Sequence, residues 1–334
     1  MKYLITGISG HVAPHLARLL LWQGEEVHVL IRETSGRKYD LLDIMSPSEL
    51  DAITFHYGDF VDIQTLIPIF QENKFDGVFH LGAMSHPPTS FKYPLYTMKT
   101  NIQGTANIAE CIRLYNPECI LCNVSTSEVY GDECKNIGVL KEDMNLYPSN
   151  PYGWSKMCAE RFIRERCKNG FLKGFSTRAF SHLAPRRGKN FSISWDAYHL
   201  ALMKLGLKKN KLLPVGNLQT RRVVIDARDV VTAYYLLMKA FKHLPEEING
   251  ESFNVCGDID SVQKMEFFTD KLIEISGLKD VKKVIDKRVY RPIDIQIQIG
   301  DISKLKSVIN WNSVIPIEQT LTDVYNYWVK KLQK

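Results

Sequence analysis

The residues Lys2–Gly24, KYLITGISGHVAPHLARLLLWQG, place an apolar strand, a glycine-rich turn and a helix in direct succession. The first five residues are mostly apolar, and the later ones repeat apolar side chains at helical spacing. Gly24 is a natural helix stop. Between strand and helix, Gly7 and Gly10 let the backbone turn tightly. A strand that turns at once into a helix predicts the first unit of a parallel α/β sheet.

The alternation of strand and helix continues to about residue 180. Strands are predicted at residues 2–6, 25–32, 52–59, 77–83, 119–125 and 174–180, and helices at 11–24, 63–73, 100–115 and 151–167. Strands separated by helices imply crossover connections and a doubly wound parallel sheet of the Rossmann type.

Beyond residue 180 the pattern loosens into loops, helices and short strands. This change predicts a smaller, mixed C-terminal domain for the substrate. We expect a dinucleotide-binding domain over residues 1–180, to which residues 215–240 return, and a mainly substrate-binding domain over residues 181–334.

Composition narrows the class of protein. The chain has 334 residues, and its formal charge of +6 is spread along it. That mild charge does not indicate a nucleic-acid-binding protein, but it suits an anionic small substrate. The N-terminal apolar segment is too short for a signal peptide, and Arg18 interrupts the longest later one, so no membrane span is predicted.

The seven cysteines show no framework spacing. Cys119 and Cys122 lie three apart in a predicted strand and therefore face opposite ways. We interpret them as core thiols rather than as redox residues or metal ligands, and we predict no metal site. Free thiols favour the reducing cytoplasm as the compartment.

The glycine turn is the predicted cofactor end. Its backbone amides, at a helix N-terminus, suit a pyrophosphate, although a plain strand–helix turn has the same residues. Ala13 stands where a third glycine is usual. Arg32 follows the second strand and suits the 2′-phosphate of NADP, whereas the adjacent Glu33 favours a plain ribose and keeps NAD as the alternative.

Polar residues follow the predicted fifth strand in STSEVYG, residues 125–131. In an extended segment, Thr126 and Glu128 project to the same side. Polar groups at the carboxyl end of a buried strand are typical of an α/β active site. A solvated exit from the strand has the same composition, so this stretch alone leaves both interpretations open.

Tyr152 and Lys156 lie four apart and share a helix face. A lysine ammonium beside a phenol stabilises the phenolate and lowers the phenol pKa, which makes Tyr152 a usable general base. Tyr-x-x-x-Lys alone usually marks a helix surface. Its position after the repeated strand–helix units, the glycine turn and the polar strand end favours a catalytic role.

With these motifs in place, the chain resembles extended short-chain dehydrogenases/reductases that act on nucleotide sugars, and within them it is most similar to GDP-mannose 4,6-dehydratases. The similarity covers nearly the whole chain. It rests on TGISGHVA, LGAMSHPPTSFKYPLYTMKTNIQGT, STSEVYG, YPSNPYGWSK, APRRGKNF, GNLQTRR and RPIDIQIQIGDISKLK.

The resemblance implies a lyase that converts GDP-mannose or GDP-manno-heptose to a 4-keto-6-deoxy sugar by internal hydride transfer. Tyr152, tuned by Lys156, would take the proton of the C4 hydroxyl while hydride leaves C4 for the nicotinamide. Glu128 would then remove the C5 proton as water leaves C6, and the hydride would return to C6. Thr126 would hydrogen-bond the sugar O4.

The resemblance also implies the binding residues. The cofactor set is Gly7, Ser9, Gly10, His11, Val12, Arg32, Asp59, Phe60, Leu81, Ala83, Tyr152, Lys156, His182 and Arg187. The substrate set is Ser85, Ser127, Asn217, Arg222, Arg291 and Asp294. Surface ion pairing is the alternative for Arg222 and Arg291, and a plain turn for Asn217. The Arg186–Arg187 loop reaches a neighbouring subunit's cofactor in such dehydratases, which implies a tetramer; a solvated basic loop is the alternative. We expect a homodimer or homotetramer.

Several residues depart from the pattern of these dehydratases. Met84, Pro87, Pro88 and Ser181 would border the sugar or the nicotinamide, and they put the identity of the sugar in question. A nucleotide-sugar C4 dehydrogenase, reductase or 4-epimerase is the alternative on the same fold, although none of these needs a C5 base. UDP-glucuronate decarboxylases share a TSEVYGD-like segment. A non-catalytic NADP-sensing protein is a more remote alternative, because such proteins tend to lose the tyrosine–lysine pair.

Overall fold

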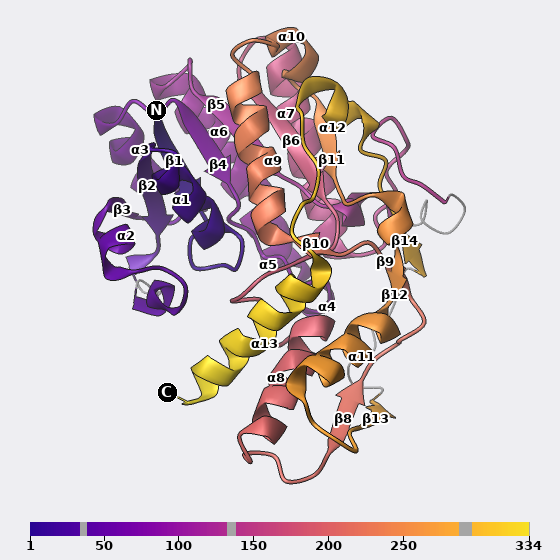
Figure 1. The fold of residues 1–334 in the computed structure, drawn as a ribbon. Coiled ribbons are helices and arrows are strands. Elements are labelled where there is room, and N and C mark those ends of the chain that lie inside the picture. Colours follow the sequence, from indigo (N-terminus) through magenta and orange to yellow (C-terminus); the bar gives the residue numbers. More distant parts are fainter. Residues whose placement is uncertain (34–38, 132–137, 287–295, 334) are drawn as a thin grey trace.

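The computed structural model describes residues 1–33, 39–131, 138–286 and 296–333 (Figure 1). Seven parallel strands form its central sheet in the order β11-β6-β5-β4-β1-β2-β3. The strands are β1 Lys2–Thr6, β2 Glu26–Ile31, β3 Ile53–Tyr57, β4 Gly77–His80, β5 Ile120–Val124, β6 Lys173–Ala179 and β11 Ser252–Val255. The predicted doubly wound sheet is therefore confirmed, with its first six strands at the predicted places. The seventh strand, β11, was not predicted.

Helices cover both faces of this sheet. On one face lie α1 (Ala13–Trp22) and α9 (Ala227–Ala240), and on the other α3 (Ile63–Glu72), α6 (Gly104–Tyr115) and α7 (Pro151–Lys168). Successive residues of a strand point to opposite faces, so Tyr3 and Ile5 pack with the first group and Leu4 with the second. Burial on both faces explains why the strands read as continuous apolar runs.

A second, smaller part of the molecule lies below the sheet in Figure 1. Its core joins the helices α8 (Ser192–Lys204), α11 (Met265–Ser276) and α13 (Ile317–Gln333). Its short strands are β7 His182–Leu183, β8 Leu212–Val215, β9 Arg221–Arg222, β10 Ile225–Asp226, β12 Gln263–Lys264, β13 Lys282–Ile285 and β14 Ile297–Gln298. They form the pairs β7–β10 and β8–β13 and the three-stranded sheet β12-β9-β14.

The chain returns to the large sheet after residue 180. Helix α9 packs on α1, β11 pairs with β6, and α12 (Ser303–Val308) lies against β11. We therefore propose that the dinucleotide-binding unit consists of residues 1–180 together with these returning segments. Shorter elements complete the fold: η2 Tyr39–Asp43, α2 Pro47–Asp51, α4 Pro87–Lys92, α5 Pro94–Met98, η3 Lys99–Gln103, η4 Ser127–Val129, α10 Pro245–Ile248 and η6 Ile259–Ser261.

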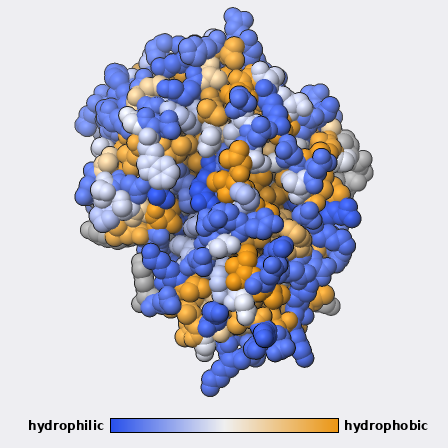
Figure 2. All heavy atoms as spheres, in the orientation of Figure 1, coloured by the Kyte–Doolittle hydropathy of each residue, from blue (hydrophilic) through white to orange (hydrophobic). Residues whose placement is uncertain are grey.

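The surface on the side drawn in Figure 2 is largely hydrophilic and is broken by apolar patches. Among the described residues, none of the helices combines the length and the apolar character that crossing a bilayer requires. Cys119 and Cys122 are buried core thiols, as predicted, and burial raises the pKa of both.

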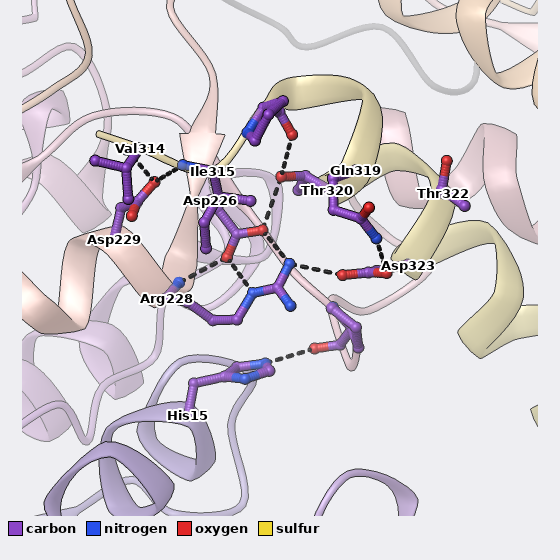
Figure 3. A network of polar contacts seen from close by, with 12 residues as sticks. His15, Asp226, Arg228, Asp229, Val314, Ile315, Gln319, Thr320, Thr322 and Asp323 are labelled. Carbon is purple, nitrogen blue, oxygen red and sulfur yellow. Dashed lines mark hydrogen bonds and ion pairs between the residues drawn. The ribbon is translucent and has the colours of Figure 1, made fainter. Parts of the chain in front are cut away.

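A polar network joins the two parts (Figure 3). Asp226, completely buried, caps α9 by accepting from the backbone N–H of Arg228 at 2.7 Å. The Arg228 guanidinium donates to both oxygens of Asp226, at 2.8 and 2.7 Å, and to Asp323 of α13 at 2.7 Å. Thr320 of α13 donates to Asp226 at 2.7 Å. One buried carboxylate therefore fixes the terminal helix of the smaller part to a helix of the sheet.

The two carboxylate partners of Arg228 provide a matched pair of variants that tests this connection between the two parts. Asp226→Asn leaves Thr320 and Arg228 facing a buried amide, and we expect the free energy of unfolding to fall by about 2–4 kcal/mol. Asp323→Asn removes the partly exposed partner of Arg228, and we expect a loss of less than about 1 kcal/mol. Urea denaturation measures both variants. Equal losses would contradict the assignment of the joint to Asp226.

Candidate active site

A cavity of about 410 Å³ opens at the carboxyl ends of β1, β4, β5 and β6. In doubly wound sheets, ligands bind at this edge, where the strand order reverses, which here is between β1 and β4. The predicted residues that line the cavity are Gly7, Ser9, Gly10, His11, Val12, Arg32, Leu81, Ala83, Ser85, Thr126, Ser127, Glu128, Tyr152, Lys156, His182 and Arg187. The structure thus brings together side chains that are up to 180 residues apart in the sequence.

The glycine turn at the bottom of this cavity has no room for a side chain. Gly7 has a φ of +80°, and a Cβ built on it would lie 2.7 Å from the backbone nitrogen of Gly82. Gly10 donates its N–H to the Gly7 carbonyl at 2.9 Å, and α1 begins three residues later. The sequence uses glycine here because the turn passes directly against the loop after β4.

His11 gives a second sign of a ligand at this turn. Its Nε2 is buried and has no hydrogen-bond partner among the described residues, while its Nδ1 lies 3.2 Å from Arg187 Nη1. Burial, followed by the charge of Arg187, lowers the pKa of His11 well below its usual value. A neutral imidazole with an unused nitrogen and a side-chain-free turn fit a dinucleotide held against α1.

The polar segment that follows β5 adopts a backbone conformation different from the predicted one. The chain leaves β5 at Val124 and enters a 3-10 turn, η4, in which the Thr126 hydroxyl accepts from the Glu128 N–H at 3.3 Å. The extended alternation that we expected is therefore wrong, because this capping bond turns the chain. Thr126 and Glu128 nevertheless both line the cavity.

Asn150 connects Glu128 to the helix that carries the tyrosine. Its Nδ2 donates to Glu128 Oε2 at 2.9 Å, and its Oδ1 accepts from the Gly153 N–H at 2.8 Å as the N-cap of α7. One asparagine thus orients the carboxylate and begins the helix. The sequence indicated the cap but not its bond to Glu128.

Tyr152 and Lys156 lie on the first turns of α7, and both are buried. Burial raises the pKa of Tyr152 to about 12; a hydrogen bond with Thr126 acts in the opposite direction, and the charge of Glu128 adds to the rise. Burial lowers the pKa of Lys156 to about 8, and the charge of Glu160 opposes this change. The predicted lowering of the tyrosine pKa is thus not what the structure shows, because burial outweighs the neighbouring charges.

A buried ion pair lies one helical turn beyond Lys156. Glu160 of α7 accepts from Arg178 of β6 at 2.5 Å, and Ser252 of β11 donates to the same carboxylate at 2.9 Å. Burial acts to raise the pKa of Glu160, but Arg178 outweighs it and holds that pKa below the usual value. This pair fixes α7 on the sheet and keeps a negative charge near Lys156.

A second cavity, of about 320 Å³, continues the first. Both are lined by Ser181, His182, Arg187 and Phe191. The second cavity is lined mostly by the smaller part of the chain, and its wall includes the predicted substrate residues Asn217 and Arg222. The two cavities form one cleft from the sheet edge into the smaller part.

Some predicted residues lie elsewhere. Asp59 accepts from the Val61 N–H at 3.0 Å, and Phe60 packs edge-on against His80, so neither lines the cavities. Both serve the turn before α3, whose local polarity resembled a binding loop. Arg291 and Asp294 lie outside the described residues.

The Arg186–Arg187 loop packs against the glycine turn of its own chain. Arg186, at a φ of 75°, donates to the carbonyls of Ser9 and Gly10 at 3.4 Å, and Arg187 contacts His11. The reach of this loop into a neighbouring subunit stays a prediction from the resemblance. Among the unusual residues, Pro87 lines the first cavity, Pro88 the second and Ser181 both, whereas Met84 lines neither and instead exchanges backbone hydrogen bonds with the Asn101 side chain.

Sequence reasoning missed other residues of the first cavity, namely Phe180, Phe191, Tyr234 and Gln298. Gln298 is buried, and its Nε2 has no hydrogen-bond partner among the described residues. A glutamine among alternating apolar residues in IQIQIG was an available signal. Tyr234 gave no such signal in the sequence, because it lies on α9, far along the chain from the cavity's other residues. In the described part of the chain, no group of acidic, histidine and cysteine side chains is arranged to hold a metal ion.

Comparisons with known proteins give the family of this chain. The family model described as "GDP-mannose 4,6 dehydratase" matches residues 4–324. GDP-mannose 4,6-dehydratase of Vibrio cholerae is 30% identical over 100% of this chain and 95% of its own length. The human GDP-mannose 4,6 dehydratase is 29% identical over 96% of this chain and 89% of its own.

Solved structures share the fold. RMD from Pseudomonas aeruginosa, complexed with NADPH, superposes with a TM-score of 0.79 at 24% identity, covering 99% of this chain and 100% of that one. UDP-glucose 4-epimerase from Thermotoga maritima gives a TM-score of 0.80 at 23% identity, with the same coverage. Because the family match spans nearly the whole sequence, the chain belongs to the GDP-mannose 4,6-dehydratase family, a family of short-chain dehydrogenase/reductase-type lyases.

Proposed function

We propose that the protein is a GDP-sugar 4,6-dehydratase that acts on GDP-mannose or GDP-manno-heptose and forms a 4-keto-6-deoxy sugar. The observation that carries this proposal is the presence of Thr126, Glu128, Tyr152 and Lys156 in one cavity at the sheet edge. A tyrosine and a lysine suffice for oxidation at C4, whereas loss of water also needs a base for the C5 proton. Glu128 supplies that second base.

The roles follow from the positions of these groups. Tyr152 takes the proton of the sugar's C4 hydroxyl, and Thr126 hydrogen-bonds O4. Tyr152 takes that proton as the phenolate, which the ammonium of Lys156 stabilises. Because burial lowers the pKa of Lys156 to about 8, this lysine exchanges protons near neutral pH more readily than an exposed lysine. Glu128, oriented by Asn150 at 2.9 Å, takes the proton from C5 once the C4 ketone has made it acidic, and passes it to the C6 hydroxyl, which leaves as water. When the hydride returns to C6, a proton from solvent returns to C5.

A bound nicotinamide would accept the hydride from C4 and return it at C6. Gly7, Gly10 and His11 would hold the pyrophosphate end of such a cofactor at the start of α1. Arg32 lines the same cavity, and its guanidinium suits a 2′-phosphate, so we propose NADP, with NAD as the alternative. NADPH in the related Pseudomonas aeruginosa structure supports this choice.

The nucleotide would extend into the second cavity. Arg187, Lys189 and Arg222 line it, which supports binding of a diphosphate there, with Asn217 as a further polar contact. Ser85 and Ser127 line the first cavity and would contact the sugar. Arg291 and Asp294 stay predictions from the resemblance.

A C4 epimerase or reductase remains the second candidate, because epimerases share the fold. Glu128 weighs against it, since neither reaction needs a C5 base.

We also propose a cytoplasmic homo-oligomer. Large apolar side chains exposed along α5 and the adjoining start of α7, such as Leu95, Tyr96 and Trp154, support an association surface.

The glycine turn gives a test that does not depend on turnover. Gly7→Ala places a methyl group 2.7 Å from Gly82, so we expect dinucleotide affinity to fall more than about tenfold, which corresponds to about 1.4 kcal/mol. Gly24→Ala is the control, because Gly24 also has a positive φ, +72°, but nothing within 4 Å of its Cβ. Fluorescence titration with NADPH should show unchanged affinity for the control. Equal affinities in the two variants would contradict the role of the turn.

Substitution of Arg32 tests whether the cofactor is NADP or NAD. Arg32→Gln removes the charge that would face a 2′-phosphate, and we expect roughly ten- to hundredfold weaker NADP binding with little change for NAD. Glu33→Gln is the matched variant and should strengthen NADP binding, because it removes a repelling charge. Preference of the wild type for NAD would mean that Glu33 governs the ribose.

Glu128 and Tyr152 can be separated by the step at which each variant stops. Glu128→Gln should reduce NADP nearly stoichiometrically with enzyme and then form product roughly a hundred- to ten-thousandfold more slowly. Tyr152→Phe should not reduce the cofactor at all, because O4 keeps its proton. Stopped-flow absorbance follows the reduced nicotinamide, and mass spectrometry follows the product. A Glu128→Gln enzyme that dehydrates at the normal rate would eliminate Glu128 as the C5 base.

A further inference from the structure

The second cavity contains one acidic residue among cationic ones. Arg187, Lys189 and Arg222 line it, as binding of a diphosphate requires, yet Asp196 is also part of its wall. Among the described residues, Asp196 is the only acidic one that lines this cavity. An anion site gains nothing from a carboxylate unless that carboxylate faces a different part of the ligand.

Asp196 is 5% exposed, and its environment provides little compensation for its burial. Thr269 of α11 donates its hydroxyl to Asp196 Oδ2 at 2.7 Å, and the described residues provide no other hydrogen bond or cation for this side chain. Burial raises the pKa of Asp196 to about 7, against the effect of the Thr269 bond. A carboxylate can accept about four hydrogen bonds, so most of its capacity is unused.

The position of Asp196 indicates which part of the ligand it meets. The sugar site lies at Tyr152 in the first cavity, and the four residues shared by the two cavities do not include Asp196. A sugar nucleotide that starts at Tyr152 passes this junction with its diphosphate. Its nucleobase then enters the remaining part of the second cavity, where Leu218, Val224 and Met265 add apolar surface.

The chemistry of the bases separates the candidates. Guanine presents two adjacent donors, N1–H and the 2-amino group, which match the two oxygens of a carboxylate. Uracil has a single N–H between two carbonyls. Adenine and cytosine place a ring nitrogen acceptor next to their amino group, and a carboxylate repels that acceptor.

We propose that Asp196 is the specificity-determining residue for the nucleobase, and that its carboxylate accepts hydrogen bonds from N1–H and the 2-amino group of guanine. This inference rests on the proposed function, because that function places the sugar at Tyr152. The competing explanation is that the Asp196–Thr269 bond only fixes α8 to α11.

Calorimetric titration of the full-length protein with free nucleotides tests the inference. The wild type should bind GDP most tightly. Inosine diphosphate, which lacks the 2-amino group, should bind roughly ten- to hundredfold more weakly, as expected for one lost hydrogen bond to a charged group. Xanthosine diphosphate, with a carbonyl at that position, should bind more weakly still. Equal affinity of the wild type for GDP and inosine diphosphate overturns the inference without any variant.

Asp196→Asn replaces one acceptor by a donor and can still accept from Thr269. We expect its preference to shift from GDP toward xanthosine diphosphate, whose carbonyl accepts from the new amide. Thr269→Val is the control, because it removes the bond between α8 and α11 and should keep the nucleotide order of the wild type. An Asp196→Asn protein that loses affinity for every nucleotide to the same extent, as a purely structural role requires, overturns the inference.

A separate assay for loss of water from GDP-mannose distinguishes the two proposals. A wild type that dehydrates GDP-mannose while Asp196→Asn keeps the preference for GDP contradicts only the inference about Asp196. A wild type that prefers GDP through Asp196 but dehydrates no GDP-sugar supports the inference and contradicts the proposed function.

Discussion

The buried carboxylate of Asp226 sets the geometry on which the cleft depends. It caps α9, which packs on the sheet, and it binds Thr320 of α13, which belongs to the core of the smaller part. Asp226 also ends β10, which pairs with β7, and β7 carries His182 between the two cavities. Since both cavities are built from the sheet edge and this smaller part, a shift at Asp226 would change the distance between the cofactor end and the nucleotide end.

The sheet edge supplies the chemistry within this frame. We propose that the tyrosine–lysine pair on α7 serves the oxidation at C4. The family's reaction adds an elimination, and the extra requirement is a carboxylate that is held still. We propose Glu128 for that role: Asn150 donates one hydrogen bond to it and accepts another from Gly153, which begins α7. The acid and the phenol therefore have a common support.

Local features of the sequence predicted most of the fold. Periodicity and short motifs involve only a few neighbouring residues. They were enough to predict the first six strands, the glycine turn and the tyrosine–lysine pair. The features that the sequence did not predict depend on packing between distant segments. Strand β11 and the joint at Asp226 form only after the chain returns to the sheet, and the raised pKa of Tyr152 reflects burial by several elements. Asp59 and Phe60 lie outside the two cavities, and the sequence could not indicate this because a polar turn looks alike with or without a ligand. Asp196 went unnoticed because its position in a wall shared with cationic side chains appears only in the folded chain.

We propose that this chain removes water from a GDP-linked sugar by way of a C5 carbanion-like step at Glu128. The most direct measurement is mass spectrometry of the products formed in heavy water from GDP-mannose, GDP-manno-heptose and UDP-glucose, with NADP present. We expect a GDP-linked product that has lost one water and gained one deuterium at C5. A product of unchanged formula, or a dehydrated product without deuterium at C5, would contradict it.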